Sequence, residues 1–145
     1  MPASPLPEGA FVWTNFPFGP PDRADVPGPV RHIAYVLGAR EAGRGIQMLL
    51  AYTSSGAWRG AAETAPLGVV EFTAAEARAL NQRAFHLDLR CLARVPPTAA
   101  WFPEIGTATK GIVAVASVRL QARIMKAATD LAARSPELIE VRGPR

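Results

Sequence analysis

The sequence contains very little cysteine or lysine: Cys91 is the only cysteine, and Lys110 and Lys126 are the only lysines among its 145 residues. A single cysteine excludes an internal disulfide framework and is typical of a reducing compartment. No apolar run approaches the roughly 20 residues that a membrane-spanning helix needs. The N-terminal residues also lack a basic segment followed by an apolar one, so we expect no secretory signal. These absences predict a cytoplasmic protein that does not enter a membrane.

Charged side chains are also scarce, at 19% of the chain, whereas hydrophobic residues make up 49%. This proportion excludes disorder as the main state, because the chain can bury enough apolar surface to form a core. The 12 glycines and 14 prolines favour many short elements joined by turns over a bundle of long helices. The formal net charge of +4 comes almost entirely from arginine, whose planar guanidinium suits phosphate. The charge therefore permits a polyanionic partner.

Strand-like segments dominate the chain. Apolar runs, β-branched and aromatic residues, and polar–apolar alternation predict strands at residues 10–16, 30–37, 46–53, 67–72, 84–92 and 112–116. Between the first two of these, the proline-rich segment 17–29 is predicted to be a loop, because proline lacks a backbone donor and restricts its neighbours. A loop of this length in a small domain is usually functional or mobile.

Capping residues predict two helices. Thr73 and Glu76 fit the S/T-x-x-E capping box of a short helix, and Ser117 can cap a longer one that runs to about Arg134. We therefore predict a single domain over residues 1–145 that is mainly β (α+β). Its expected architecture is an SH3-like small barrel of about five or six antiparallel strands with a C-terminal helix packed on it. Residues 1–9 are expected to form a flexible lead-in and residues 135–145 a C-terminal tail.

The strand at 84–92 carries the most distinctive polar residues. Alternation directs the odd-numbered residues from Phe85 to Cys91 to one face and His86, Asp88 and Arg90 to the other. A base, a carboxylate and a cation at this spacing can move a proton and stabilise charge on a phosphate. A solvated sheet face with an ion pair gives the same alternation.

Other candidate binding residues lie at strand ends. Arg31 and His32 stand where the proline-rich loop meets a strand, a position well placed to meet a ligand. Thr53 and Ser54 end an apolar strand with hydroxyls that can contact phosphate oxygens, although such residues are also common in turns. Trp58 with the adjoining Arg59 is the best candidate for an exposed aromatic side chain that stacks on a base.

Several kinds of site are missing from the sequence. No G-x-S-x-G segment supports a hydrolase triad, and the glycines fit neither the Walker nor the dinucleotide-binding pattern. His86, Cys91 and His32 lack partners at metal-ligand spacing. We therefore expect neither a metal nor a cofactor.

Taken in order, the segments resemble the PemK/MazF family of toxin ribonucleases. That family opens with a G-x-(V/I)-(W/Y) strand, which is similar to residues 9–13, and continues into an R-P-V-L-V-(I/L) strand, which is similar to residues 31–37 with His32 in place of proline. A strand that ends in threonine or threonine-serine resembles residues 50–54. A later strand with an acidic residue before a basic one resembles residues 86–90.

The resemblance implies a metal-independent endoribonuclease on an SH3-like barrel, usually a homodimer, that cleaves single-stranded RNA by attack of the 2′-hydroxyl on the adjacent phosphate. An antitoxin protein encoded beside such a toxin blocks its RNA groove. Carried over by residue, Arg31 matches the arginine that stabilises the phosphate, Thr53 the threonine beside it and Asp88 the acidic residue of the later strand, while His86 stands where a basic residue is common. As catalytic roles we expect Arg31 to stabilise charge, Thr53 to donate to phosphate, His86 to act as acid or base, and Asp88 to orient His86 or Arg90. The expected RNA-binding residues are His32, Ser54, Trp58, Arg59 and Arg90.

Two functions of other classes remain open at this point. A non-catalytic SH3-like module would bind a protein or nucleic acid without cutting it. A toxin of the same architecture would instead poison a protein such as gyrase. Arginine-lined strand faces favour RNA over the second alternative.

Overall fold

A computed structural model describes residues 5–43, 45–56, 58 and 64–144 of the chain. Strands β1 to β3 span Ala10–Thr14, His32–Ala42 and Gly45–Ser55, and β4 to β7 span Val69–Glu71, Phe85–Val95, Ile112–Val115 and Glu140–Arg142. The α-helices are α1 (Ala74–Ala79) and α2 (Val118–Arg134), with short 3₁₀ turns at Pro21–Arg23 and Pro136–Leu138. Each predicted strand and helix is present, with its bounds shifted by a few residues.

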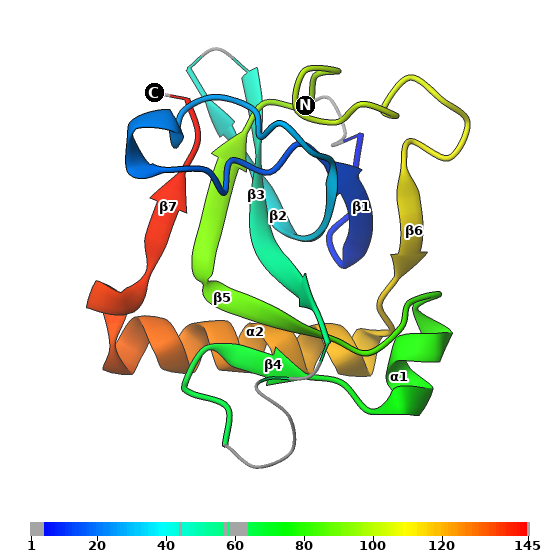
Figure 1. The fold of residues 1–145 in the computed structure, drawn as a ribbon, viewed down its shortest axis with the longest axis vertical. Helices are drawn as coiled ribbons and strands as arrows, with labels where there is room; N and C mark the ends of the chain where they lie inside the picture. The colour runs from blue at the N-terminus through cyan, green and yellow to red at the C-terminus, as the bar shows by residue number, and fades with distance from the viewer. Residues whose placement is uncertain (1–4, 44, 57, 59–63, 145) are drawn as a thin grey trace.

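The strands form one seven-stranded sheet in the order β4-β5-β3-β2-β1-β6, with antiparallel neighbours (Figure 1). This arrangement confirms a mainly β, α+β domain. The sheet is open rather than closed into a barrel: its end strands, β4 and β6, are not paired with each other in the described residues. The seventh strand, β7, lies parallel to β5 within the segment 135–145 that the sequence predicts as a tail. Its three residues are too few to show alternation.

A sharp irregularity divides β5 into two halves. Tyr52 of β3 pairs with Asp88, but the preceding Ala51 pairs with Leu92, so residues 89–91 leave the ladder. Leu89 donates its amide to the Gly68 carbonyl instead, at 2.8 Å. The extra residues bend the strand and change which side chains point to each face of the sheet.

This bend corrects the predicted alternation at one end of the segment 84–92. Phe85, Leu87 and Leu89 pack in one core cluster, as expected, but Cys91 packs against the other cluster. The prediction of a common face for Cys91 and Leu89 is therefore wrong, because alternation holds only where the ladder is continuous.

The core comprises two clusters. The first includes Phe11, Leu87 and the buried face of α2, and the second includes Phe16, Met48 and Phe102. Leu6, in the segment predicted as a flexible lead-in, is 1% exposed and belongs to the second cluster. An apolar side chain with this much burial fixes the chain around it.

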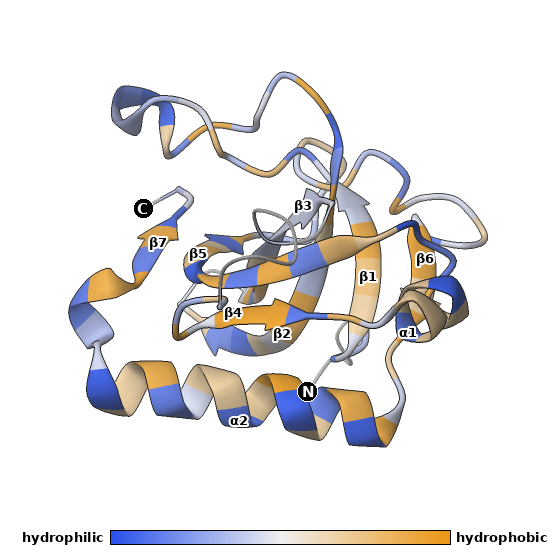
Figure 2. Cartoon of the chain, turned by 60° about the horizontal axis from the view of Figure 1, so that its bottom comes forward, coloured by the Kyte–Doolittle hydropathy of each residue, from blue (hydrophilic) through white to orange (hydrophobic). Residues whose placement is uncertain are grey.

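Both predicted helix caps are present. Thr73 and Glu76 form the reciprocal capping box of α1, and the Ser117 hydroxyl accepts from Leu120 N at the start of α2. Helix α2 runs along one end of the strands (Figure 1) with Leu120, Ile124 and Leu131 buried. Bands of hydrophilic and hydrophobic residues alternate along it (Figure 2), as expected for a helix that covers a sheet.

Candidate functional site

The predicted polar residues gather where three strands meet. The start of β2, the end of β3 and the start of β5 lie side by side because the three strands are antiparallel. Ser54 on β3 is the direct cross-strand partner of His86 on β5, and His86 is in turn the partner of Glu71 on β4. Residues that are 32 positions apart in the sequence, Ser54 and His86, thereby share one face of the sheet.

A contact with the backbone sets which ring nitrogen of His86 carries the hydrogen. Its Nδ1 atom lies 2.9 Å from the carbonyl oxygen of Gly56. A carbonyl oxygen only accepts, so Nδ1 carries the hydrogen, and in the neutral ring Nε2 has the free lone pair. The Trp58 ring meets the imidazole edge-on, with 5.4 Å between centroids. His86 therefore presents a proton-accepting atom held at a set orientation.

Asp88 contacts Arg90 rather than His86. Its carboxylate accepts from Arg90 Nε at 2.9 Å and Nη2 at 2.8 Å, and from the Arg90 backbone amide at 3.0 Å. These hydrogen bonds raise the pKa of Arg90 above its ordinary value, so the guanidinium stays charged. The guanidinium carbon lies 5.4 Å from the Trp58 ring centroid. Of the two predicted roles of Asp88, the contact supports orientation of Arg90.

His32 belongs to an aromatic group on the same side of the sheet. Its ring stacks on Tyr52 with 5.0 Å between centroids and 6° between planes, and Phe18 from the loop 17–29 lies 5.6 Å away. His32 Nε2 donates to the Thr53 carbonyl at 2.5 Å. Burial raises the pKa of Tyr52, with smaller contributions from Cys91 and Asp88, so this phenol remains neutral. The group offers flat ring faces to a base.

Thr53 points away from this face. It is 4% exposed, and its hydroxyl donates to the Ile33 carbonyl at 2.5 Å. A hydroxyl has a single proton to donate, so Thr53 links β2 to β3 and can contact a phosphate as a donor only if that bond breaks. The neighbouring Ser54 is half-buried beside His86 and supplies a hydroxyl on the polar face.

Arg31 directly precedes β2, and its side chain lies over Trp13 of β1. Its Nη1 atom pairs with Glu104 Oε2 at 2.7 Å, and its guanidinium carbon stacks 4.5 Å from the Trp13 ring centroid. The side chain is 54% exposed, so the charge remains available to a ligand. Arg59, the remaining predicted RNA-binding residue, lies outside the described residues.

A cavity of about 360 Å³ lies at these strand ends, beside His32 and Ser54. It is lined by residues of the predicted site and by others that sequence reasoning did not identify: Trp13, His32, Ile33, Thr53, Ser54, Ser55, Asn81, Gln82, Arg83, Ala84 and Phe85. Residues 81–84 were missed because only tertiary packing brings them to the strand ends. The polar run of residues 81–83 after α1 is the single sequence signal that could have suggested them.

The predicted loop 17–29 is tied to the C-terminal strand. Arg142 Nη1 donates to the carbonyls of Pro17 and Gly19, and the Gly143 amide donates to Ala24. Figure 1 shows the loop beside the red end of β7. Phe18 therefore reaches the aromatic group from an anchored segment.

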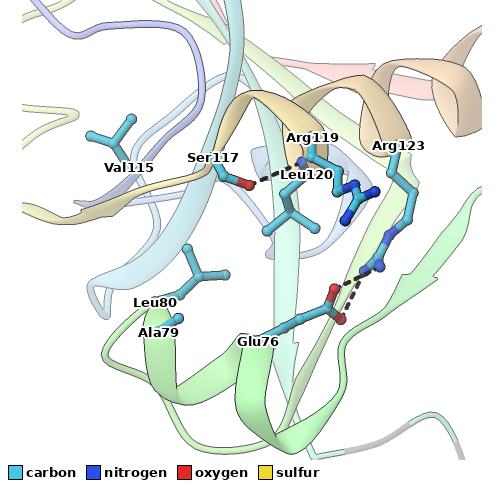
Figure 3. A pocket seen from close by; sticks show the side chains of 8 residues that line it. All are labelled: Glu76, Ala79, Leu80, Val115, Ser117, Arg119, Leu120 and Arg123. Carbon is cyan, nitrogen blue, oxygen red and sulfur yellow. Dashed lines mark hydrogen bonds and ion pairs between the residues drawn. The ribbon is translucent and has the colours of Figure 1, made fainter.

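A second cavity, of about 630 Å³, lies between α1 and the start of α2 and contains none of the predicted site residues (Figure 3). Arg123 crosses one side to pair with Glu76 at 2.8 Å. This ion pair and the capping bond from Thr73 lower the pKa of Glu76. The contacts indicate that Arg123 and Glu76 hold the two helices together.

No group of three or more histidine, cysteine, aspartate or glutamate side chains is arranged to hold a metal ion within the described ranges. Among the helices formed by those residues, none combines the length and apolarity needed to cross a membrane. Comparison with known proteins yields no matching family model, no matching curated protein and no matching solved structure.

Proposed function

We propose that the chain is an endoribonuclease that cleaves single-stranded RNA without a metal ion. The observation that carries this proposal is the state of His86. Its Nδ1 donates to Gly56, its Nε2 has no hydrogen-bond partner in the described ranges, and its cross-strand neighbour is Ser54. Imidazole is the side chain best suited to proton transfer between pH 5 and 8.

In the proposed reaction, His86 Nε2 takes the proton of a ribose 2′-hydroxyl. The 2′-oxygen then forms a bond to the adjacent phosphorus, and the bond from phosphorus to the 5′-oxygen breaks. The leaving 5′-oxygen takes a proton from solvent, and the products are a 2′,3′-cyclic phosphate and a free 5′-hydroxyl. The reaction exchanges one bond from phosphorus to oxygen for another and involves no oxidation or reduction.

The cations around this face suit a phosphate that gains charge. Arg31 has an exposed guanidinium, and Arg90 is held by Asp88 beside Trp58. A fixed positive charge placed where a phosphate becomes more negative lowers the barrier. Trp58 and the stacked His32–Tyr52 pair supply ring faces for the flanking bases.

The finer features implied by the PemK/MazF resemblance belong to the same proposal: an SH3-like arrangement of the curved sheet, a homodimer, a cognate antitoxin protein that covers the RNA-binding face, and a cytoplasmic location. The end strands β4 and β6 leave backbone groups on which a second chain can pair. Size-exclusion chromatography with light scattering tests the dimer directly.

Incubation of the purified protein with a long single-stranded RNA in EDTA, followed by end mapping, tests the activity. Discrete cuts with 2′,3′-cyclic phosphate ends that are lost in His86→Gln support the ribonuclease. RNA that is bound but intact identifies a non-catalytic module. Failure to bind or cut RNA directs attention to a protein target such as gyrase.

A further inference from the structure

The cavity of about 360 Å³ beside the proposed catalytic face has the size and lining of a ligand site. Its volume falls within the roughly 300–1,000 Å³ of small-molecule pockets. Trp13, Ile33 and Phe85 supply apolar and aromatic surface, and Ser54 and Gln82 supply polar groups. A flat ring with a few hydrogen-bonding atoms, such as a nucleobase, matches that combination.

Gln82 contributes an unpaired donor to this lining. Its Nε2 atom is buried, with less than 1 Å² exposed, and has no hydrogen-bond partner in the part of the chain that the structure describes. Leaving a buried amide donor unpaired is costly, so such a group calls for an acceptor. Rotation about the side-chain torsions of Gln82 turns the amide toward an acceptor that enters the cavity.

The backbone beneath Gln82 is fixed. Gln82 N donates to the Ala77 carbonyl at 2.9 Å. Asn81 adopts a left-handed conformation with φ of 57°, and its Nδ2 donates to the Val113 carbonyl at 3.1 Å. These bonds hold the Gln82 backbone at one place in the wall, and the side chain is left to turn.

We propose that this cavity binds one base of the RNA, next to the scissile phosphate, and selects a keto base, guanine or uracil, over an amino base, adenine or cytosine. The inference rests on the proposed ribonuclease function, because it names the base read at that site. A keto oxygen accepts from Gln82 Nε2. An exocyclic amino group places N–H against N–H and leaves both donors unpaired.

Arg83 strengthens the same selection. It lines the cavity with an exposed side chain and has no ion pair among the residues that the structure describes. Its guanidinium carries only donors, so it too favours an acceptor edge on the base. Two neighbouring lining residues, Gln82 and Arg83, therefore carry side-chain donors that can turn toward an acceptor in the cavity.

Uridine and cytidine 3′-monophosphates are matched probes, because their bases differ only at C4 and N3: uracil has a keto oxygen and an N–H there, and cytosine an amino group and an unprotonated nitrogen. We expect uridine monophosphate to shift the Gln82 side-chain amide signals in NMR spectra and to bind roughly ten- to a hundredfold more tightly than cytidine monophosphate. The Gln121 amide, which already donates to the Ala116 carbonyl, is the internal reference. Equal affinities, or no shift at Gln82 with either nucleotide, would overturn the inference.

Two substitutions extend this test. Gln82→Glu replaces the donor by an acceptor, so the preference should reverse toward cytidine monophosphate. Gln82→Met keeps the length but removes the donor, so the two affinities should converge, and it carries the test if Gln82→Glu does not fold. A preference for the uridine nucleotide that is as large in Gln82→Met as in the wild type would contradict the assignment.

Cleavage maps separate this inference from the proposed function. If the wild type cuts RNA and Gln82→Met retains the same base preference at the cut, the keto-base pocket is wrong and the ribonuclease stands. If the wild type cuts no RNA but discriminates uridine from cytidine monophosphate through Gln82, the ribonuclease is wrong and the pocket's selectivity stands.

Discussion

His86 Nδ1 lies 2.9 Å from the carbonyl oxygen of Gly56, the residue directly after β3. Because Gly56 N also donates to the Ala84 carbonyl at 2.7 Å, the end of β3 and the start of β5 hold this carbonyl in place. The imidazole is thereby oriented by backbone rather than by a carboxylate. One ring nitrogen is occupied and the other has no hydrogen-bond partner among the described residues, which is the arrangement that proton transfer requires.

We expect His86 Nε2 to take part in proton transfer during RNA cleavage. His86→Gln should lower RNA cleavage by roughly 10²- to 10⁴-fold, the usual contribution of a general acid or base. Its thermal unfolding temperature should remain close to that of the wild type, because the side chain is only half-buried. Gel assays with an end-labelled RNA measure the loss, and His32→Gln serves as the matched histidine variant. Cleavage that stays within a few-fold of wild type would remove His86 from the mechanism.

Substitutions at Arg31 and Glu104 distinguish the effect of the Arg31 charge on cleavage from the effect of the ion pair on stability. Arg31→Ala should reduce cleavage by roughly 10²- to 10³-fold, as expected for loss of a donor to the charged phosphate. The free energy of unfolding should change by less than about 1 kcal/mol, because exposed ion pairs contribute little. Glu104→Gln breaks the same ion pair but keeps the guanidinium, so this variant should remain active. Equal losses in both variants would show that the pair, rather than the Arg31 charge, matters.

Asp88 and Arg90 should stabilise the bend in β5 as a unit. The carboxylate accepts three hydrogen bonds from Arg90, and both side chains are largely buried. A double-mutant cycle with Asp88→Asn and Arg90→Met, followed by urea unfolding, should give a coupling free energy of about 0.5–3 kcal/mol. Additive effects of the two substitutions would mean that the ion pair does not support the bend.

Cys91 reports on the packing after the bend. Burial disfavours the charged thiolate and raises the pKa of the Cys91 thiol to about 11. At pH 8 roughly one thiol in a thousand is then ionised, against about a quarter for an exposed thiol of pKa about 8.5. Alkylation by iodoacetamide at pH 8 should be slow in the native protein, accelerate as pH rises toward 11, and become rapid in urea. Equal native and unfolded rates would contradict the described burial.

The local elements of the fold follow from local sequence. The Thr73–Glu76 capping box and the Ser117 cap are predictable because their hydrogen bonds join residues three positions apart. The bend in β5 was not predictable, since it depends on the Gly68 carbonyl receiving Leu89 N. The sequence also could not show that the sheet stays open, because closure depends on pairing between β4 and β6, which the described residues lack and which no short-range pattern encodes.

The candidate site likewise combines features that local sequence predicts with features that depend on tertiary contacts. Sequence alternation places His86, Asp88 and Arg90 on one face up to the bend, and the strand order brings Ser54 beside His86. The contacts of His86 with Gly56 and of Thr53 with Ile33 are tertiary. The sequence therefore could not show which His86 nitrogen carries the hydrogen or that the Thr53 hydroxyl donates to a carbonyl. Gln82 was missed for the same reason: nothing near it in sequence indicates a buried, unpaired amide.

The most direct test of the central claim is cleavage of a long single-stranded RNA in EDTA by the wild type and by His86→Gln, with every product end mapped. We expect discrete cuts that leave 2′,3′-cyclic phosphates and 5′-hydroxyls in the wild type and almost none in the variant. Intact RNA in the wild-type reaction, or identical cuts from both proteins, would contradict it.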